Sequence, residues 1–432
     1  MENFKKGSEV ILKGGEKATV VRTIGNGGQG VIYEVLYRNK PYALKWYLRE
    51  YLKNIDQKEF YNNLCDNQAA GAPSKDFLWP IAVSEYTENS FGYLMPLRPK
   101  GYSDFSSILN AKKRFASVRV QISAAKNICK AFQALHSQGY SYQDINNGNF
   151  FINVATGDIL VCDNDNVAPC GTWMGMAGKD RYMAPEIVLR KKHAGMESDL
   201  YSLAIVLFMI FFVAHPLEGR AVHACPCLTA KYMRYFYAEH PVFVYDPADA
   251  SNRPVAGIDN NVIRLWSCYP KSLRALFERA FTKGLFEEGY RVRENEWIDC
   301  FNGMEGLLVT CPLCGGEQFY SPMNDGKNEF VCEDCKRKIR KPFLLQGKKR
   351  CKVLYPGTVL KYSDIAYTDD DSVCGVVIES KRHPGLWGLR IKDDMRWEAK
   401  YTNGTVKKQE KVIPLLRNTE LTIQDQNMQI II

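Results

Sequence analysis

The stretch Tyr142-Gln143-Asp144-Ile145-Asn146-Asn147-Gly148-Asn149 decides the fold of this chain. It places an aspartate five residues before an asparagine in a short polar segment. After it, an apolar run that ends in Val161-Cys162-Asp163-Asn164-Asp165 predicts a strand that stops on acidic residues. A turn or a helix cap would explain each of these polar residues taken singly, but it would not explain why they occur in this order and at this spacing.

A glycine-rich turn lies upstream. Ala18 to Ile24 and Val31 to Leu36 are typical of strands, and Gly25-Asn26-Gly27-Gly28-Gln29-Gly30 joins them. Because a strand follows the turn, the pattern predicts a β-hairpin and not a dinucleotide-binding fingerprint. Glycine lets the backbone approach phosphate, although a merely flexible turn would have the same sequence. A further strand, Tyr42 to Trp46, carries Lys45.

Two features follow the acidic string. Ala184-Pro185-Glu186 begins 21 residues after Asp163, and Ser198-Asp199 precedes the apolar run from Tyr201 to Ala214. A membrane span needs about 20 apolar residues, and this run has 14. We therefore predict a buried core helix and no membrane segment.

The order and spacing of these elements resemble those of eukaryotic-type protein kinases over about residues 8 to 304. The resemblance implies an α+β, bilobal protein-kinase-like fold over residues 1 to 304, and ATP and Mg²⁺ as cofactors. It assigns catalytic roles to Lys45, Asp144, Asn149 and Asp163. Lys45 would hold the phosphates, Asp144 would accept the substrate's hydroxyl proton, and Asn149 and Asp163 would bind Mg²⁺ through hard oxygen atoms.

The resemblance also implies the remaining nucleotide contacts. A helix from about Asp56 to Gln68 would supply the acidic partner of Lys45, for which we choose Glu59 over Glu50. Met95, Pro96 and Arg98 would form the hinge that meets adenine, although an ordinary surface turn would look similar. The full nucleotide-binding set is Gly25, Asn26, Gly27, Gly28, Gln29, Gly30, Ile32, Ala43, Lys45, Glu59, Met95, Pro96, Arg98, Asn149 and Asp163.

Three residues depart from the kinase pattern. Gln143 replaces an arginine, so no guanidinium is available to bind an activation-loop phosphate. Asn146 replaces a lysine, and Asp165 replaces the glycine of the DFG motif. We interpret Asp165 as a turn residue, with a third metal ligand as the alternative. The missing cation could come from Lys179 or Arg181.

The segment from Asp163 to Glu186 completes the comparison. Thr172 is its candidate for autophosphorylation, but we favour the interpretation of Thr172 as a solvated loop threonine. By resemblance, we expect Glu186 to form a salt bridge with Arg291 and Asp199 to accept backbone N–H groups.

Two cysteine pairs predict a metal site. Cys311-Pro-Leu-Cys314 and Cys332-Glu-Asp-Cys335 have 17 residues between them, the spacing of a zinc ribbon. Four thiolates fill a tetrahedral Zn²⁺ site, so the metal would be structural. A redox role fits less well, because neither pair opens a βαβ unit. We assign residues 305 to 345 to a zinc ribbon that binds Zn²⁺ through Cys311, Cys314, Cys332 and Cys335.

The chain of 432 residues carries a net charge of +9, and the excess is local. Residues 336 to 352, KRKIRKPFLLQGKKRCK, hold nine basic side chains and no acidic one. Since Phe343 is the only aromatic residue in this run, we do not expect nucleic-acid binding and favour a protein partner. Short β-branched and aromatic runs from residue 346 to 432 predict a small β-sandwich that resembles forkhead-associated-like tails.

Composition sets the remaining expectations. A hydrophobic content of 46% excludes a disordered chain. The 14 cysteines, with no apolar signal in MENFKKGSEV, predict a reducing, cytoplasmic location.

The strings GYLMPL, FLWP and DNDNV carry a narrower resemblance, to bacterial kinases of the tellurium-resistance-associated type. It implies signalling or stress response, with a metal-dependent phosphatase and a von Willebrand A-domain protein as partners. We predict a Ser/Thr protein kinase that acts on protein substrates. The alternative is a pseudokinase scaffold that binds nucleotide or partner proteins without efficient phosphoryl transfer, which the three departures favour.

Overall fold

The computed structural model describes residues 4–173, 178–320, 329–348, 350–366, 368 and 370–431. Residues 174–177 of the predicted activation segment, 321–328 of the predicted zinc ribbon and Lys349 lie outside the described residues. The chain forms two compact units. The first comprises Met1–Ala116, Ser123–Trp266 and Arg274–Trp297, and the second Ser117–Ile122, Ser267–Leu273 and Ile298–Ile432.

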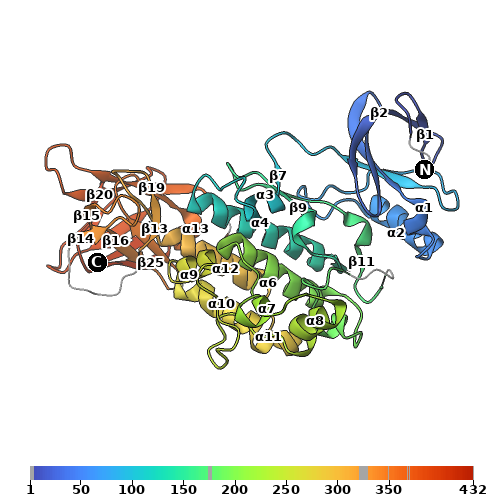
Figure 1. Ribbon diagram of the computed structural model, residues 1–432. Coiled ribbons are helices and arrows are strands. Elements are labelled where there is room, and N and C mark those ends of the chain that lie inside the picture. Colours follow the sequence, from blue (N-terminus) through green and yellow to red (C-terminus); the bar gives the residue numbers. More distant parts are fainter. Residues whose placement is uncertain are drawn as a thin grey trace. The chain divides into compact units, whose positions relative to one another are not determined.

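The first unit begins with an antiparallel sheet, coloured blue in Figure 1. It has six strands in the order β1-β2-β3-β4-β6-β5. Successive side chains of a strand point to opposite faces, and here both faces are apolar. Tyr33 and Leu44 belong to the core on one face, whereas Ala43 and Met95 pack with helix α2 on the other. The elements are β1 (Glu9–Ile11), β2 (Lys17–Asn26), β3 (Gly30–Tyr37), β4 (Lys40–Tyr47), α1 (Arg49–Leu52), α2 (Gln57–Ala70), β5 (Ala82–Val83) and β6 (Gly92–Pro96).

Helices form most of the remainder of this unit, around α6 (Met196–Phe212). Every residue of α6 from Ser198 to Phe212 is buried, which confirms the predicted core helix. No helix in the described part of the chain is long and apolar enough to cross a membrane. The other helices of this unit are α3 (Phe105–Leu109), α5 (Pro185–Val188), α7 (Arg220–His223), α8 (Ala230–Arg234), α9 (Asn260–Trp266) and α11 (Lys283–Phe286). Three helices contribute residues to both units: α4 (Val118–Ser137), α10 (Lys271–Phe281) and α12 (Glu294–Gly306).

Short strands and tight turns beside these helices carry the candidate site. They are β7 (Ser103–Asp104), β8 (Tyr140–Ser141), η1 (Asn147–Asn149), β9 (Phe150–Ile152), β10 (Ile159–Val161), η2 (Asn164–Asn166) and β11 (Ala168–Pro169). Strands β9 and β10 pair antiparallel, so the two polar segments that flank them lie close together.

Beyond α12, the second unit is built mainly from strands. Two hairpins come first, β12 (Leu308–Thr310) with β13 (Glu317–Phe319), and β14 (Glu329–Val331) with β15 (Lys338–Arg340). Two sheets follow, of six strands (β17-β16-β25-β24-β21-β22) and four strands (β18-β19-β20-β23). Residues of both sheets, including Leu345, Leu389 and Ile430, share one hydrophobic core. The strands are β16 (Phe343–Gln346), β17 (Cys351–Leu354), β18 (Val359–Lys361), β19 (Val373–Glu379), β20 (Trp387–Ile391), β21 (Trp397–Lys400), β22 (Val406–Lys408), β23 (Ile413–Pro414), β24 (Thr419–Ile423) and β25 (Gln426–Ile431), with the short helix α13 (Tyr362–Ile365).

Acidic neighbours partly neutralise the basic run of this unit. Lys352 is buried and pairs with Asp364 at 2.9 Å, and Lys336 lies 3.3 Å from Glu333. The run is therefore less of an electrostatic patch than its sequence indicates.

Candidate active site

Strand β4 presents Lys45 at the centre of the candidate site. Lys45 is buried and stands opposite Ile32 of β3 in the sheet. Its Nζ atom donates to Asp165 Oδ2 at 2.7 Å and to Gln29 Oε1 at 2.8 Å, and lies 3.4 Å from Asp163 Oδ1. Burial alone would lower the pKa of Lys45, but the carboxylates of Asp165 and Asp163 raise it above its usual value. The ammonium therefore stays charged.

Asp165 is the closest ionic partner of Lys45. It lies in η2 and is 0% exposed. Its Oδ2 atom also accepts a hydrogen bond from the Tyr47 hydroxyl at 2.6 Å, and its Oδ1 atom is buried without a hydrogen-bond partner among the described residues. The interpretation of Asp165 as a simple turn residue is wrong, because a turn does not require a buried ion pair.

Glu59 does not reach Lys45. It is exposed in the first turn of α2, where the helix dipole stabilises a carboxylate without any cation. The alternative, Glu50, pairs with Lys53 at 3.4 Å. The predicted pair of Glu59 with Lys45 is therefore wrong, and Asp165 takes its place.

Helix α2 contacts the acidic segment through neutral side chains instead. The amides of Asn63 and Asn67 donate to the carbonyl of Val167 at 2.9 and 2.8 Å, and both residues are buried. The sequence signal was the spacing of four between these asparagines, which places them on the same helix face as buried Phe60 and Leu64.

The loop around Asp144 is held by amide side chains. Asn146 Nδ2 donates to Asp144 Oδ1 at 3.1 Å, and Asn149 Nδ2 donates to the Asp144 carbonyl at 3.0 Å. Burial raises the pKa of Asp144 to about 6, although Asn146 and the charge of Lys179 oppose this rise. An ionised carboxylate with a raised pKa accepts a proton more readily, which suits a general base.

Oxygen ligands for Mg²⁺ are available at Asn149 and Asp163. The amide nitrogen of Asn149 donates to the Tyr142 hydroxyl at 2.9 Å and to Asp144, which leaves its oxygen as the metal ligand. The backbone N–H of Cys162 donates to the Asn149 carbonyl at 2.9 Å, so Asn149 lies beside the residue that precedes Asp163. Asp163 has a left-handed backbone, with φ of 55°, and a side chain that is 42% exposed. This donor set fits the oxygen preference of Mg²⁺.

Gln143 joins this loop to the segment after η2. Its Nε2 atom donates to the Thr172 carbonyl at 2.7 Å and to Ser141 Oγ at 3.1 Å. A neutral amide thus makes a direct contact where the kinase pattern has an arginine.

The predicted hairpin and its glycine turn are present, with β2 ending at Asn26 and β3 beginning at Gly30. Gly27 N–H donates to the Gly30 carbonyl at 2.9 Å. A Cβ atom on Gly30 would lie 2.5 Å from the Trp46 carbonyl oxygen, so this position requires glycine. No atom of the described residues lies within 4 Å of a Cβ built on Gly28, which leaves its backbone open to a ligand. Gly25 is the residue opposite Ile32 in the hairpin.

Apolar side chains for a nucleotide base lie next to Lys45. Ala43 stands opposite Met95 across β4 and β6, and both belong to one cluster with Ile32 and Leu160. Pro96 ends β6. The exposed Arg98 side chain donates to Asp104 at 3.2 Å, so only its backbone remains for the predicted adenine contact.

Two predicted scaffold contacts are confirmed. Arg291 donates to both carboxylate oxygens of Glu186 at 2.9 Å. Asp199 accepts the backbone N–H groups of Tyr142 at 2.6 Å and Gln143 at 2.9 Å, so the buried helix α6 positions the loop of Asp144.

A histidine that sequence reasoning missed stabilises this scaffold. The ring of His136 is buried between Asp199, 3.2 Å away, and Glu294. Burial would lower the pKa of His136, but the hydrogen bonds to the two carboxylates raise it to about 9. The imidazolium therefore balances the charge of Asp199.

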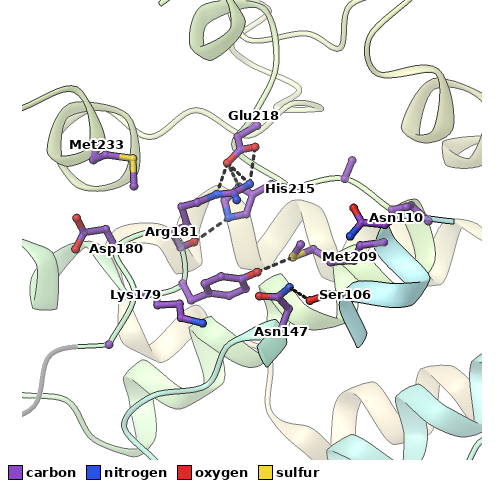
Figure 2. Close-up of a pocket in the computed structure, with 15 residues that line it drawn as sticks. Ser106, Asn110, Asn147, Lys179, Asp180, Arg181, Met209, His215, Glu218 and Met233 are labelled. Atoms are coloured by element: carbon purple, nitrogen blue, oxygen red, sulfur yellow. Dashed lines mark hydrogen bonds and ion pairs between the residues drawn. The ribbon is translucent and has the colours of Figure 1, made fainter. Parts of the chain in front are cut away.

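A cavity of about 760 Å³ opens beside the Asp144 loop (Figure 2). Its lining includes Asn147 and residues 178–182. Arg181 donates to both oxygens of Glu218 at 2.7 Å, and His215 donates from Nε2 to the Arg181 carbonyl at 2.8 Å. Burial lowers the pKa of His215 to about 4, so this histidine is neutral.

The four predicted zinc ligands come together in the second unit. The Sγ atoms of Cys311, Cys314, Cys332 and Cys335 all lie within 4.8 Å of one another. The two hairpins supply one CxxC pair each, and four thiolates at this spacing fit a tetrahedral Zn²⁺ ion.

Comparison with known proteins settles the family. The model of the protein kinase domain matches residues 18–235. The chain belongs to the protein kinase family. The match covers the glycine turn, Lys45, the Asp144 loop and Asp163, which are the residues gathered in the candidate site.

Individual kinases are similar over longer stretches at low identity. The Escherichia coli K12 protein kinase YegI is 23% identical over 335 residues, covering 71% of this chain and 48% of YegI. Human serine/threonine-protein kinase TNNI3K is 24% identical over 271 residues, covering 57% of this chain and 29% of that kinase. The probable serine/threonine-protein kinase C70.05c of Schizosaccharomyces pombe is 32% identical over 103 residues, which is 22% of this chain and 13% of the relative. The chain thus spans less than half the length of each of these relatives.

Proposed function

We propose that this kinase transfers the γ-phosphate of ATP to serine or threonine hydroxyls of proteins, with Mg²⁺ as cofactor. The observation that carries the proposal is the buried ammonium of Lys45, held beside Asp163 and next to a loop that presents Asp144 and Asn149. Phosphoryl transfer needs positioning and charge neutralisation more than covalent chemistry by the protein. Serine and threonine are chosen because two of the relatives carry those residues in their names.

Each residue has one task in this proposal. Lys45 binds the phosphates, and Asn149 and Asp163 hold Mg²⁺, which neutralises phosphate charge when bound. Asp144 accepts the proton of the attacking hydroxyl. Ile32, Ala43 and Met95 provide apolar contact for adenine.

The pseudokinase alternative rests on Gln143, Asn146 and Asp165. Two of these departures have a compensating contact. Asp165 pairs with Lys45 where a helix glutamate would, and Gln143 binds the Thr172 carbonyl directly. These contacts favour a working enzyme over a scaffold.

We further propose that Cys311, Cys314, Cys332 and Cys335 form a structural zinc ribbon. The two sheets that follow it would be a forkhead-associated-like β-sandwich that recruits protein partners. A metal-dependent phosphatase and a von Willebrand A-domain protein are the proposed partners, in cytoplasmic signalling or stress response. Pull-down with the second unit intact and with Cys332→Ser tests this role.

Incubation with γ-labelled ATP, Mg²⁺ and a generic protein substrate tests the enzymatic proposal. We expect label on serine or threonine, loss of labelling in Asp163→Ala, and normal labelling in Asp66→Ala, which removes an exposed carboxylate of α2. Thermal stabilisation by nucleotide without any transfer would select the pseudokinase instead.

A further inference from the structure

Among the described residues, one cation at the Asp144 loop has a neutral amide as its acceptor and no carboxylate partner. Lys179 Nζ donates to Asn146 Oδ1 at 2.8 Å. Lys179 lies 16 residues after Asp163, outside the loop that carries Asp144. Figure 2 shows its side chain extending toward Asn147 in the cavity beside this loop.

The amide of Asn146 links this ammonium to Asp144. Its oxygen accepts from Lys179 and from the Gly148 N–H at 2.9 Å, and its nitrogen donates to Asp144 Oδ1 at 3.1 Å. Because the oxygen of the buried Asn146 amide faces two donors and its nitrogen faces an acceptor, the orientation of the amide is fixed. Lys179 is therefore two hydrogen bonds away from the proposed base.

Two glycines allow this close approach. A Cβ atom on Gly178 would lie 3.2 Å from Asp144 Oδ1, and one on Gly148 would lie 3.3 Å from Lys179 Nζ. Both distances are tighter than ordinary van der Waals contact, so a side chain at either position would shift Asp144 or the tip of Lys179 by a few tenths of an ångström.

The neighbouring cations are already paired. Arg181 is held by both oxygens of Glu218, and Lys45 by Asp165. Among the described residues that line the cavity, Lys179 is the cation whose acceptor is a neutral amide. Its charge is therefore available to an incoming anion.

We propose that Lys179 is a catalytic residue that stabilises the phosphoryl group during transfer, supplying from the segment after Asp163 the cation that Asn146 lacks. This inference rests on the proposed function. In the step, the substrate hydroxyl oxygen bonds to the γ-phosphorus while the bond from that phosphorus to the bridging oxygen breaks. The bridging oxygen keeps the electron pair and leaves with ADP, and the hydroxyl proton passes to Asp144. Lys179 counters the charge on the transferring oxygens.

Steady-state kinetics of charge variants in the full chain test the proposal. We expect Lys179→Thr to lower kcat by about 100-fold or more, since the loss of one such donor typically costs a factor of about 100 to 1,000. The KM for ATP should change little, because Lys45 and Mg²⁺ hold the nucleotide. Lys179→Arg should keep most of the activity. Lys191→Thr, which removes an exposed cation beyond the end of this segment, should behave as the wild type.

A charge-relocation variant makes the test specific. Asn146→Lys combined with Lys179→Thr returns a cation to the Asp144 loop and should regain at least about tenfold of the lost kcat. If the wild type transfers phosphate but Lys179→Thr keeps its kcat within about threefold, this inference fails and the proposed function stands. If both variants melt like the wild type and the double variant is no faster than Lys179→Thr, the cation role also fails. A wild type that transfers no phosphate would refute the proposed function itself.

Discussion

Replacing Asp165 with asparagine tests the ion pair on which the site is built. Asp165→Asn keeps the shape of the side chain and suits a turn equally well, but it removes the charge that faces Lys45 at 2.7 Å. The Lys45 and Asp165 side chains are 4% and 0% exposed, so water cannot replace the lost charge. Removing one member of a buried pair typically costs about 3 to 5 kcal/mol. In Asp165→Asn, Lys45 would keep only the longer contact with the partly exposed Asp163, at 3.4 Å.

Denaturant unfolding of the full chain measures this cost. We expect Asp165→Asn to lower the free energy of unfolding of the first unit by about 3 kcal/mol or more. Asp66→Asn is the matched control, because Asp66 is exposed on α2, and its free energy of unfolding should match that of the wild type. In a double-mutant cycle, Lys45→Met and Asp165→Asn together should cost less than the sum of the two single changes. A loss below about 1 kcal/mol with additive single effects would show that Asp165 is only a turn residue.

Three further predictions follow from other contacts. The pKa of His136 is raised from 6.5 to about 9, so the stabilisation that its imidazolium gives the fold is complete below pH 6.5 and is lost as the pH rises to 9 and above. The Tm of the wild type should fall over this range by the equivalent of about 3 kcal/mol. A pH-independent Tm, or an equal fall in His136→Gln, would contradict this role of His136. Thr172→Ala should leave kcat unchanged, because Gln143 donates to the backbone carbonyl of Thr172 and not to its hydroxyl. A large loss of kcat, together with phosphate on Thr172 of the wild type in mass spectra, would show that phosphorylation activates the enzyme instead. Native mass spectrometry should find one Zn²⁺ per chain in the wild type and none in Cys332→Ser, because four thiolates are needed to complete the site. A wild type without metal would refute the zinc ribbon.

Much of the first unit could be predicted from its sequence because its signals are local or depend on order along the chain. The glycine hairpin and the buried helix α6 follow from turn chemistry and hydrophobic runs. The partners of Glu186 and Asp199 follow from the resemblance to protein kinases. The cluster of four cysteines also follows from their spacing.

The partner of Lys45 could not be predicted in this way. Glu59 lies on the helix that follows the strand of Lys45, where the resemblance to kinases places the acidic partner. It stands in the first turn of α2, and the orientation of that turn depends on tertiary packing. Asp165 reaches Lys45 because the left-handed backbone of Asp163 turns η2 into the core, and composition alone does not reveal that turn. Aspartate is common in solvated turns, so its sequence context favoured the wrong role.

A crystal structure of the chain with Mg²⁺ and a non-hydrolysable ATP analogue tests the central claim most directly. The account predicts nucleotide phosphates on Lys45, Mg²⁺ on Asn149 and Asp163, and the ion pair of Lys45 with Asp165 retained. Nucleotide bound away from Lys45, or Asp163 without contact to the metal, would contradict it.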